Sequence, residues 1–163
     1  MSAASGSGWQ ALARGAALRA AEPAGLAREF LCFELAGAPY ALPVGELREI
    51  ARLRALTPLP RAALDVLGIA SLRGQVICVI DLRRRLGLPA EPPGRSARLA
   101  IVSDPERGLC GLLVDRVCGV QRSDASQLRP AGAAGGRAVA GLLARGGGFA
   151  TLLDLARVLD REA

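Results

Sequence analysis

The sequence predicts an all-β fold, made of small barrels or a sandwich with short helical turns. Two observations carry this prediction. From residue 30 onward, short apolar segments rich in strand-forming residues alternate with turn signals. The order of these segments also recurs in the second half of the chain. The 163 residues are 51% apolar, which is enough for a core. The longest apolar runs have about six residues, far fewer than a membrane span needs.

The first predicted element is a β-hairpin. Residues 30–35 and 40–44 are typical of strands, and residues 36–39, Ala-Gly-Ala-Pro, supply the turn. Residues 47–53 follow and allow two interpretations. Their alternation predicts a third strand, whereas the recurrence of apolar residues at every third position fits a helix. Periodicity alone leaves both open.

A second hairpin is predicted further along the chain. Residues 67–72 and 76–80 are its strands, joined by the turn Arg73-Gly74-Gln75. Asp81 comes directly after the second strand and precedes a short segment of helix formers. We therefore expect Asp81 to cap a helical turn over residues 82–88.

An internal repeat links the two halves of the chain. At an offset of 73 residues, two glycines and the capping aspartate of the second hairpin meet residues of the same type. At an offset of 70, three apolar residues of the first hairpin region meet apolar residues. These pairs are Gly68 and Gly141, Gly74 and Gly147, Asp81 and Asp154, Leu42 and Leu112, Val44 and Val114, and Ile50 and Val120. The repeat predicts two similar β units of about 65 residues each.

The predicted domain organisation follows from changes in composition. Residues 1–28 are rich in Ala, Gly, Ser and Arg and predict a disordered or weakly helical extension. Residues 29–160 form the folded part. We expect a first subdomain at about 30–88, a proline-rich linker at 89–97 and a second subdomain at about 98–160.

The charge of the chain suggests nucleic acid, but its distribution does not support that function. The net charge is +6 and every basic residue is Arg, yet these residues are spread along the chain. The run Arg83–Arg85 is short enough to be a solvated face. Only five aromatic residues are present, which is few for a protein that stacks bases. A small basic barrel that binds nucleic acid is therefore the alternative reading rather than the main one.

Catalytic and metal-binding chemistry have little support. Histidine is absent, which removes the commonest general base and metal ligand. The four cysteines lie among apolar residues without a CxxC spacing, so we expect buried thiols rather than a metal site or a redox pair. The glycine run at 146–148 lacks the context of a phosphate loop and is better read as a hairpin turn. The sequence predicts no catalytic residues, no metal site and no cofactor.

Four segments together resemble the CheW family, the coupling proteins of bacterial chemotaxis. They are FLCFELAGAPYALPVGELREI, VLGIASLRGQVICVIDLRRRLGL, LAIVSDPERGLCGLLVDRVCGV and AVAGLLARGGGFATLLDLARVL. The resemblance covers about residues 29–160. It implies two tandem five-stranded SH3-like β barrels packed side by side.

The resemblance also implies a function. Proteins of this family are non-catalytic adaptors that join the cytoplasmic tip of methyl-accepting chemoreceptors to the regulatory domain of a CheA-type histidine kinase. The expected location is cytoplasmic, at membrane-associated receptor arrays, without insertion into the membrane. The chemosensory pathway, whether flagellar, pilus-based or another, does not follow from the sequence.

The resemblance implies partner-binding residues as well. Glu49 and Arg73 match a Glu and an Arg that are functionally important in the family, although a surface turn arginine is the plain alternative for Arg73. Five apolar residues match the groove between the barrels that takes the receptor tip, although core packing is the alternative for each: Val44, Leu47, Leu99, Val117 and Val120. No residue is assigned to the kinase contact.

Overall fold

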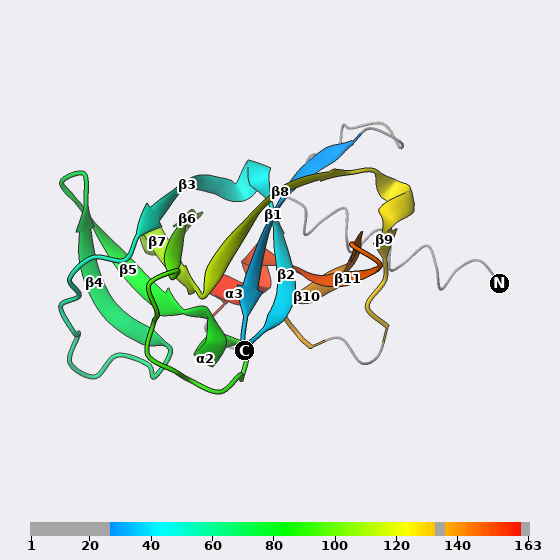
Figure 1. The fold of residues 1–163 in the computed structure, drawn as a ribbon. Helices are drawn as coiled ribbons and strands as arrows, with labels where there is room; N and C mark the ends of the chain where they lie inside the picture. The colour runs from blue at the N-terminus through cyan, green and yellow to red at the C-terminus, as the bar shows by residue number, and fades with distance from the viewer. Residues whose placement is uncertain (1–26, 133–135, 161–163) are drawn as a thin grey trace. The chain divides into compact units, whose positions relative to one another are not determined.

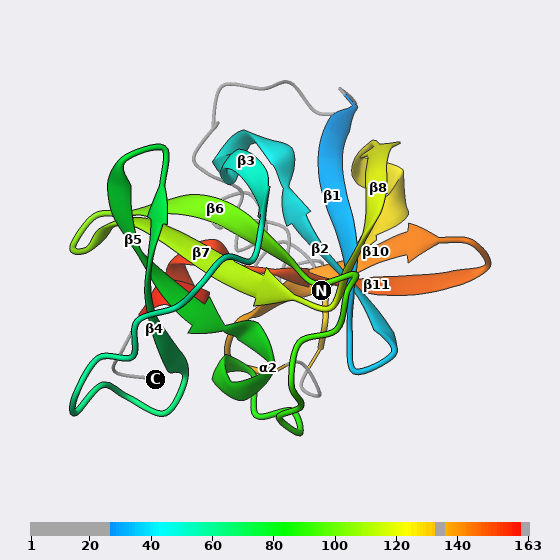
Figure 2. The same ribbon diagram turned by 60° about the vertical axis from the view of Figure 1, so that its left-hand side comes forward.

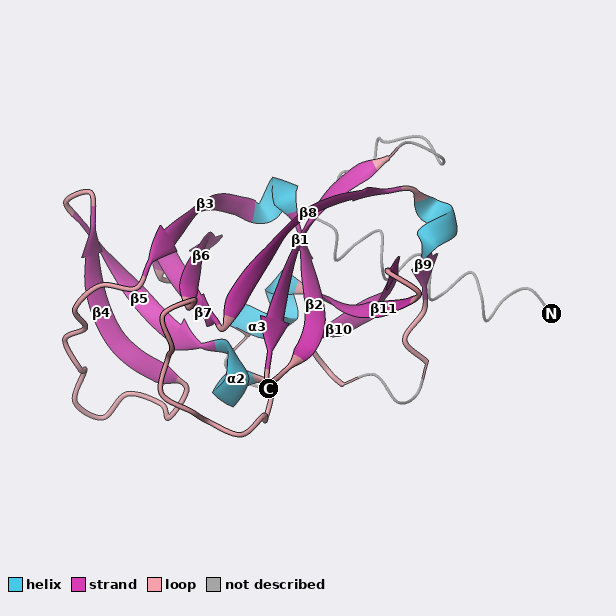
Figure 3. Cartoon of the chain, in the orientation of Figure 1, coloured by secondary structure: helices cyan, strands magenta, loops and turns pink. Residues whose placement is uncertain are grey.

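The structure is a computed structural model that describes residues 27–132 and 136–160. Nearly all of the predicted extension at 1–28 lies outside the described residues. Within them the secondary structure is mostly strand, with short helices only (Figures 1 and 3). The strands form two sheets, so the all-β prediction is confirmed. None of the described helices is long and apolar enough to cross a membrane.

The first sheet has six strands. Their order across the sheet is β8 (Arg116–Ser123), β1 (Arg28–Leu35), β2 (Ala38–Pro43), β11 (Gly148–Leu153), β10 (Val139–Arg145) and β9 (Leu128–Arg129). The two-residue strand β9 lies at one edge. It falls within a segment for which the sequence showed no element, because a two-residue strand carries no periodicity.

The second sheet has five strands. Their order is β3 (Leu47–Arg52), β6 (Arg98–Asp104), β7 (Gly108–Val114), β5 (Gln75–Asp81) and β4 (Val66–Leu72). The segment that allowed two interpretations is therefore a strand, β3, preceded by the 3-10 helix η1 (Val44–Glu46). The remaining helices are α2 (Leu82–Arg85), η2 (Ala125–Gln127) and α3 (Leu155–Leu159).

The internal repeat is present in the structure, strand for strand. At the offset of 73, strands β4 and β5 and helix α2 match β10, β11 and α3, and both hairpins carry a register shift at the equivalent glycine. Asp81 accepts a hydrogen bond from the Arg83 N–H at 3.1 Å, and Asp154 accepts one from the Arg157 N–H at 3.3 Å. The predicted cap Asp81 is confirmed, and its repeat partner Asp154 caps α3 in the same way.

The repeats exchange their hairpins. Strand β2 of the first half pairs in parallel with β11 of the second, and β5 of the first half pairs in parallel with β7 of the second (Figure 2). Strand β3 likewise pairs with β6 across the halves. Each sheet therefore contains a first hairpin from one repeat and a second hairpin from the other.

This exchange changes the expected domain organisation. The chain forms two compact units, which are not the sequential parts 30–88 and 98–160. Within the described residues, unit 1 comprises 27–32, 38–45 and 118–160, and unit 2 comprises 33–37 and 46–117. The segment 89–97, expected to be a linker between subdomains, lies within unit 2. Local turn signals reveal the hairpins, but the pairing between hairpins depends on distant contacts.

Each unit has its own apolar core. In unit 1 the cluster is centred on Phe30, Cys32, Leu143 and Leu152, all at most 2% exposed. In unit 2 the most buried members of the cluster are Ile77, Val79, Leu99 and Ile101. Strand alternation places these side chains on one face of each sheet. The central strands are buried on their other face too, as Leu31, Ala100 and Leu112 show.

Candidate functional site

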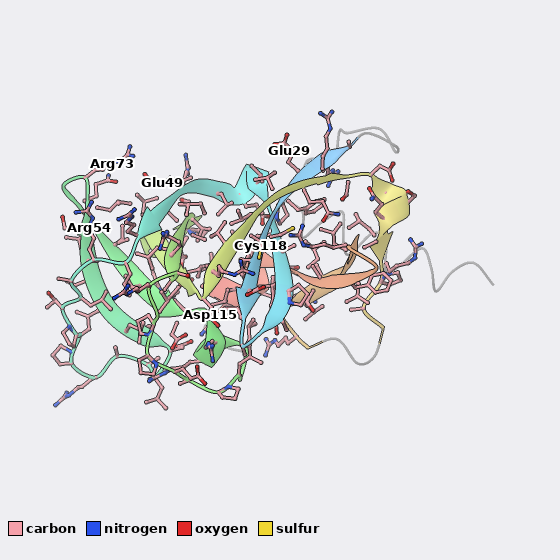
Figure 4. The ribbon with its side chains drawn as sticks, in the orientation of Figure 1. Glu29, Glu49, Arg54, Arg73, Asp115 and Cys118 are labelled. Carbon is pink, nitrogen blue, oxygen red and sulfur yellow. The ribbon has the colours of Figure 1, made fainter. Side chains whose placement is uncertain are left out.

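The candidate site begins with an ion pair on the surface of unit 2. Glu49 lies on strand β3, and Arg73 lies in the turn between β4 and β5. Arg73 Nη2 is 3.3 Å from Glu49 Oε1, so the structure brings together two residues that are 24 positions apart. Arg73 and Gly74 both have positive φ, at 51° and 82°, which is the backbone of a tight two-residue hairpin turn. The turn holds the Arg73 side chain out from the sheet (Figure 4).

This ion pair contributes little to the stability of the fold, so its position on the surface fits a role in binding better than a structural role. The Arg73 side chain is 80% exposed, and the Glu49 side chain is 29% exposed. Exposed ion pairs of this kind stabilise a fold by about 0–1 kcal/mol. A strand and a hairpin turn thus present a guanidinium and a carboxylate to solvent in fixed positions. Such a pair can bind a polar partner.

The pair belongs to a surface depression, which we call the β3–β4 depression. It is open to solvent and lies entirely within unit 2. Its lining comes from β3, the residues after it, and the end of β4 with its turn: Glu49, Ala51, Arg52, Arg54, Ala55, Ser71, Leu72 and Arg73. Sequence reasoning had found Glu49 and Arg73 but missed Arg52 and Arg54, for which no local pattern in the sequence is a signal.

The predicted receptor-contact residues lie in different environments. Leu99 is 2% exposed and belongs to the core of unit 2, as the core alternative expected. Val44 in η1 and Leu47 on β3 are half-buried. Leu99 is therefore held within its unit, whereas Val44 and Leu47 keep some exposed surface.

The two valines of β8 face opposite sides of that strand. Val117 is half-buried, whereas Val120 is 58% exposed. Residues three positions apart in a strand point to opposite faces, and the burial of β8 alternates accordingly. Among the five apolar candidates, Val120 is thus the one with the largest exposed fraction.

Two of the three arginines in the 83–85 run are not solvated, contrary to expectation, whereas Arg84 is exposed. The side chains of Arg83 and Arg85 are only 12% and 13% exposed. Arg83 Nε donates to Asp115 at 2.9 Å, and Arg85 Nη1 donates to Asp65 at 2.7 Å. Asp115 also accepts the Ala36 N–H at 2.8 Å. These contacts join helix α2 to segments distant in sequence, so within unit 2 Arg83 and Arg85 have a structural role.

The electrostatic environment of Asp115 lowers its pKa. Partial burial acts to raise the pKa, but the hydrogen bonds from Arg83 and from the Ala36 N–H, together with the positive charge of Arg83, outweigh it. A carboxylate whose pKa is lower in the folded state stabilises the fold above its unfolded pKa of about 4. That stabilisation is lost as the pH falls through the folded pKa.

We therefore expect Asp115→Asn to reduce the free energy of unfolding at pH 7 and to flatten its decline below about pH 4, because Asn does not titrate there. Urea unfolding between pH 7 and pH 2 measures both effects. Glu106→Gln, which removes an exposed carboxylate in the turn between β6 and β7, is the matched control and should follow the wild type. Parallel curves for wild type and Asp115→Asn would contradict the assignment.

The four cysteines differ in exposure, which corrects the expectation that all are buried. Cys32 and Cys110 are buried, Cys78 is half-buried, and Cys118 on β8 is exposed. Burial raises the pKa of the Cys110 thiol to about 11, and burial also raises the pKa of the Cys32 thiol. The thiolate is the reactive form of cysteine. These two thiols should therefore react slowly, because they are inaccessible to reagents and because their raised pKa keeps them protonated.

We accordingly expect iodoacetamide at pH 8 to alkylate Cys118 first in the native protein. Mass spectrometry of the quenched reaction gives the order of labelling. Cys118→Ser should remove the fast phase, and urea should make all remaining cysteines reactive. Equal early labelling of Cys110 and Cys118 would contradict the burial described above.

The described residues show no metal centre. Within 27–132 and 136–160, no group of three or more His, Cys, Asp or Glu side chains is placed to hold an ion. The aspartates that stood out in the sequence are the helix caps Asp81 and Asp154 and the ion-paired Asp115. The β3–β4 depression is thus the feature of unit 2 that calls for a functional explanation.

Comparison with known proteins agrees with this architecture. The family model described as a CheW-like domain matches residues 29–163. The chain belongs to the CheW family. This match covers both compact units of the described residues.

Individual relatives and a solved structure support the assignment. The chain is 36% identical over 91 residues to a probable chemotaxis protein CheW of Rhizobium etli, covering 55% of this chain and 57% of that protein. It is 30% identical over 135 residues to the chemotaxis protein CheW of Thermotoga maritima, covering 81% and 87%. The crystal structure of the scaffolding protein TtCheW from Thermoanaerobacter tengcongensis superposes with a TM-score of 0.75 at 25% identity, covering 80% of this chain and 91% of that one.

The extent of these matches differs between relatives. The matched part spans 57% of the Rhizobium etli protein and 66% of the chemotaxis protein CheW of Rhizobium meliloti. The chain therefore covers a little over half to two thirds of the first relatives, whereas the matches to the Thermotoga protein and to the solved structure are nearly complete.

Proposed function

We propose that the protein is a non-catalytic adaptor that couples methyl-accepting chemoreceptors to a CheA-type histidine kinase in a chemosensory array. The observation that carries the proposal is the exposed Glu49–Arg73 pair, held by a strand and a tight turn of a CheW-like domain. In this proposal the protein acts in the cytoplasm at membrane-associated arrays. The names of the relatives, chemotaxis protein and scaffolding protein, support it.

The proposed mechanism relies on affinity and geometry rather than turnover. An adaptor that binds receptor and kinase together raises the local concentration of the kinase at the receptor. Two units with well-packed cores suit this role, because rigid surfaces lose little conformational freedom on binding. A signal would change how tightly receptor, adaptor and kinase bind one another. The populations of their bound states would shift accordingly.

Binding to nucleic acid is the rival function that the net charge of +6 suggests. The chain's family membership does not favour it. Within the described part of unit 2, the arginines of the 83–85 run are also engaged by carboxylates, since Arg83 contacts Asp115 and Arg85 contacts Asp65. These charges are neutralised within the fold and offer little to a phosphate backbone.

Co-sedimentation tests the proposed function. The full chain is mixed with assembled cytoplasmic fragments of a chemoreceptor and with a CheA-type kinase, both from the same organism. We expect the receptor assemblies to carry the kinase into the pellet only when the chain is present. If the chain stays in the supernatant and instead shifts an RNA or DNA oligonucleotide at low salt, the adaptor proposal fails and the rival is supported.

A further inference from the structure

Two cysteines of unit 2 lie opposite each other on neighbouring strands. Cys78 on β5 and Cys110 on β7 are register partners in a parallel strand pair of the second sheet (Figure 2). Neighbouring strands are about 4.7–4.9 Å apart, which falls within the range of Cα separations of about 4.4–6.8 Å that a disulfide spans. The two residues are far apart in the chain, so their spacing in the sequence does not predict this pair.

Both thiols point to the same face of the sheet. Ile77 and Val79, the neighbours of Cys78 along β5, belong to the apolar core cluster of unit 2. Leu109, which precedes Cys110 along β7, packs against the same cluster. Since side chains alternate between the faces of a strand, Cys78 and Cys110 both point to the opposite face. Their sulfur atoms therefore lie on one side of the sheet, on adjacent strands.

The two thiols differ in their access to solvent. Cys110 is buried, whereas Cys78 is half-buried. Burial is the main cause of the raised pKa of Cys110, and the Cys78 thiol is close enough to add to it. A small oxidant from solvent therefore reaches Cys78 first. Cys110 is placed to react with the oxidised form of Cys78 rather than with the oxidant itself.

A carboxylate lies beside the buried thiol. The Cys110 S–H donates to Asp104 Oδ2 at 4.0 Å, and Asp104 is only 6% exposed. The same Asp104 oxygen is 3.6 Å from Arg107 Nη1. A thiol must lose its proton before its sulfur attacks, because the thiolate is the nucleophile. Here a buried carboxylate is in place to accept that proton.

We propose that Cys78 and Cys110 form an oxidisable dithiol, a modification site that hydrogen peroxide converts into a disulfide between β5 and β7. In the first step the Cys78 sulfur attacks one oxygen of the peroxide, the O–O bond breaks, and Cys78 becomes a sulfenic acid while water leaves. In the second step Cys110 passes its proton to Asp104 and its sulfur attacks the Cys78 sulfur. The S–S bond forms, the S–O bond breaks, and the departing hydroxide takes the proton from Asp104 to leave as water. Two thiols are oxidised, and one hydrogen peroxide is reduced to two waters.

The disulfide would link the two repeats within unit 2. Strand β5 belongs to the first repeat and β7 to the second, and their pairing is one of the exchanged contacts. A cross-link between distant residues stabilises a fold mainly by restricting the unfolded chain. In the reducing cytoplasm of the proposed function, such a bond forms under oxidative conditions and is reversed by thiol reductants. The site is thus a reversible modification that does not depend on the partners proposed above.

Peptide mapping of the oxidised full chain tests the proposal. The dilute, fully reduced chain is treated with hydrogen peroxide, blocked with iodoacetamide in urea and digested with trypsin without reductant. Cleavage after arginine puts Cys78 in peptide 74–83 and Cys110 in peptide 108–116, and the other two cysteines fall in separate peptides. We expect these two peptides to be linked, with a mass lower than their sum by two hydrogen atoms, and we expect a thiol reductant to separate them.

Three variants make the result specific. Cys118→Ser, which removes the exposed thiol, is the matched control and should form the linked peptide to the same extent as wild type. Cys110→Ala should form no linked peptide and should leave a sulfenic acid on Cys78 that dimedone traps, and Cys78→Ser, at a half-buried position, replaces it if it unfolds. Oxidation should also raise the urea midpoint of wild type and Cys118→Ser but not that of Cys110→Ala or Cys78→Ser. The inference is overturned if peroxide leaves Cys78 and Cys110 both open to alkylation, links either one only to another cysteine, or takes Cys78 to the sulfinic acid without a link.

Discussion

Arg73→Glu is expected to abolish coupling of the kinase to the receptor while leaving the fold intact. The substitution places a carboxylate about where the guanidinium now lies, 3.3 Å from Glu49, and turns an attraction into a repulsion. Because the Arg73 side chain is 80% exposed, the cost to the free energy of unfolding should be below about 1 kcal/mol. Partner affinity should fall about tenfold or more, since a partner that meets Arg73 now meets the opposite charge.

A charge swap separates a structural role of the pair from a role in binding. Glu49→Arg/Arg73→Glu restores the ion pair with its polarity reversed, so it repairs any purely structural defect. If the two side chains contact the partner, coupling should remain lost in the swap variant. Full recovery of coupling in the swap would show that the pair only stabilises the turn, and wild-type coupling by Arg73→Glu alone would remove the pair from the site.

Gly68→Ala is expected to destabilise unit 2 by about 2–4 kcal/mol, through backbone strain and overpacking together. Gly68 has a φ of +147°, which residues with a Cβ rarely adopt. A Cβ at this position would lie 2.4 Å from the backbone oxygen of Thr57. That oxygen accepts the Ile69 N–H at 2.9 Å, and the Thr57 N–H donates to the Ile69 carbonyl at 2.8 Å. The added methyl group therefore forces apart the bridge that holds the segment before β4 against this edge strand.

Chemical denaturation monitored by circular dichroism measures this loss. Gly94→Ala is the matched control, because Gly94 is exposed, has no positive φ and has no atom within 4 Å of an added Cβ. The control should change the free energy of unfolding by less than about 0.5 kcal/mol. A Gly68→Ala variant as stable as the control would mean that Thr57 and β4 do not approach as described.

The local elements of this fold are well predicted by the sequence. The hairpin turn at Arg73-Gly74, the helix caps Asp81 and Asp154, and the repeat offsets of 73 and 70 all appear in the structure, down to the shared register shift in the two hairpins. Turn residues and caps act within a few positions of the chain, so their signals are visible without knowledge of the tertiary structure.

The pairing of the hairpins could not be predicted in the same way. The sequential halves suggested two self-contained units, but β2 pairs with β11 and β5 pairs with β7. Because the two repeats are similar, the second hairpin of one repeat could pair with the first hairpin of either repeat. Both arrangements have the same local sequence pattern. The choice between them depends on contacts of high sequence separation, which no periodicity records.

Side-chain environments set a second limit. Arg83 lies in a run that resembles a solvated face, yet its side chain is only 12% exposed and pairs with Asp115, 32 positions away. Cys118 lies beside the apolar Val117, yet it is exposed, because Cys118 is on the outward-facing side of β8. For the candidate site, family resemblance indicated Glu49 and Arg73, whereas Arg52 and Arg54 became visible only when β3 and β4 were seen to line one depression.

The central claim is that this chain lets a receptor control a kinase. The most direct test measures autophosphorylation of the CheA-type kinase with chemoreceptor assemblies from the same organism, in the presence and absence of the full chain. We predict that the receptor changes the rate of phosphorylation only when the chain is present, and that Arg73→Glu removes this change. A phosphorylation rate that is the same with and without the chain would contradict the adaptor function.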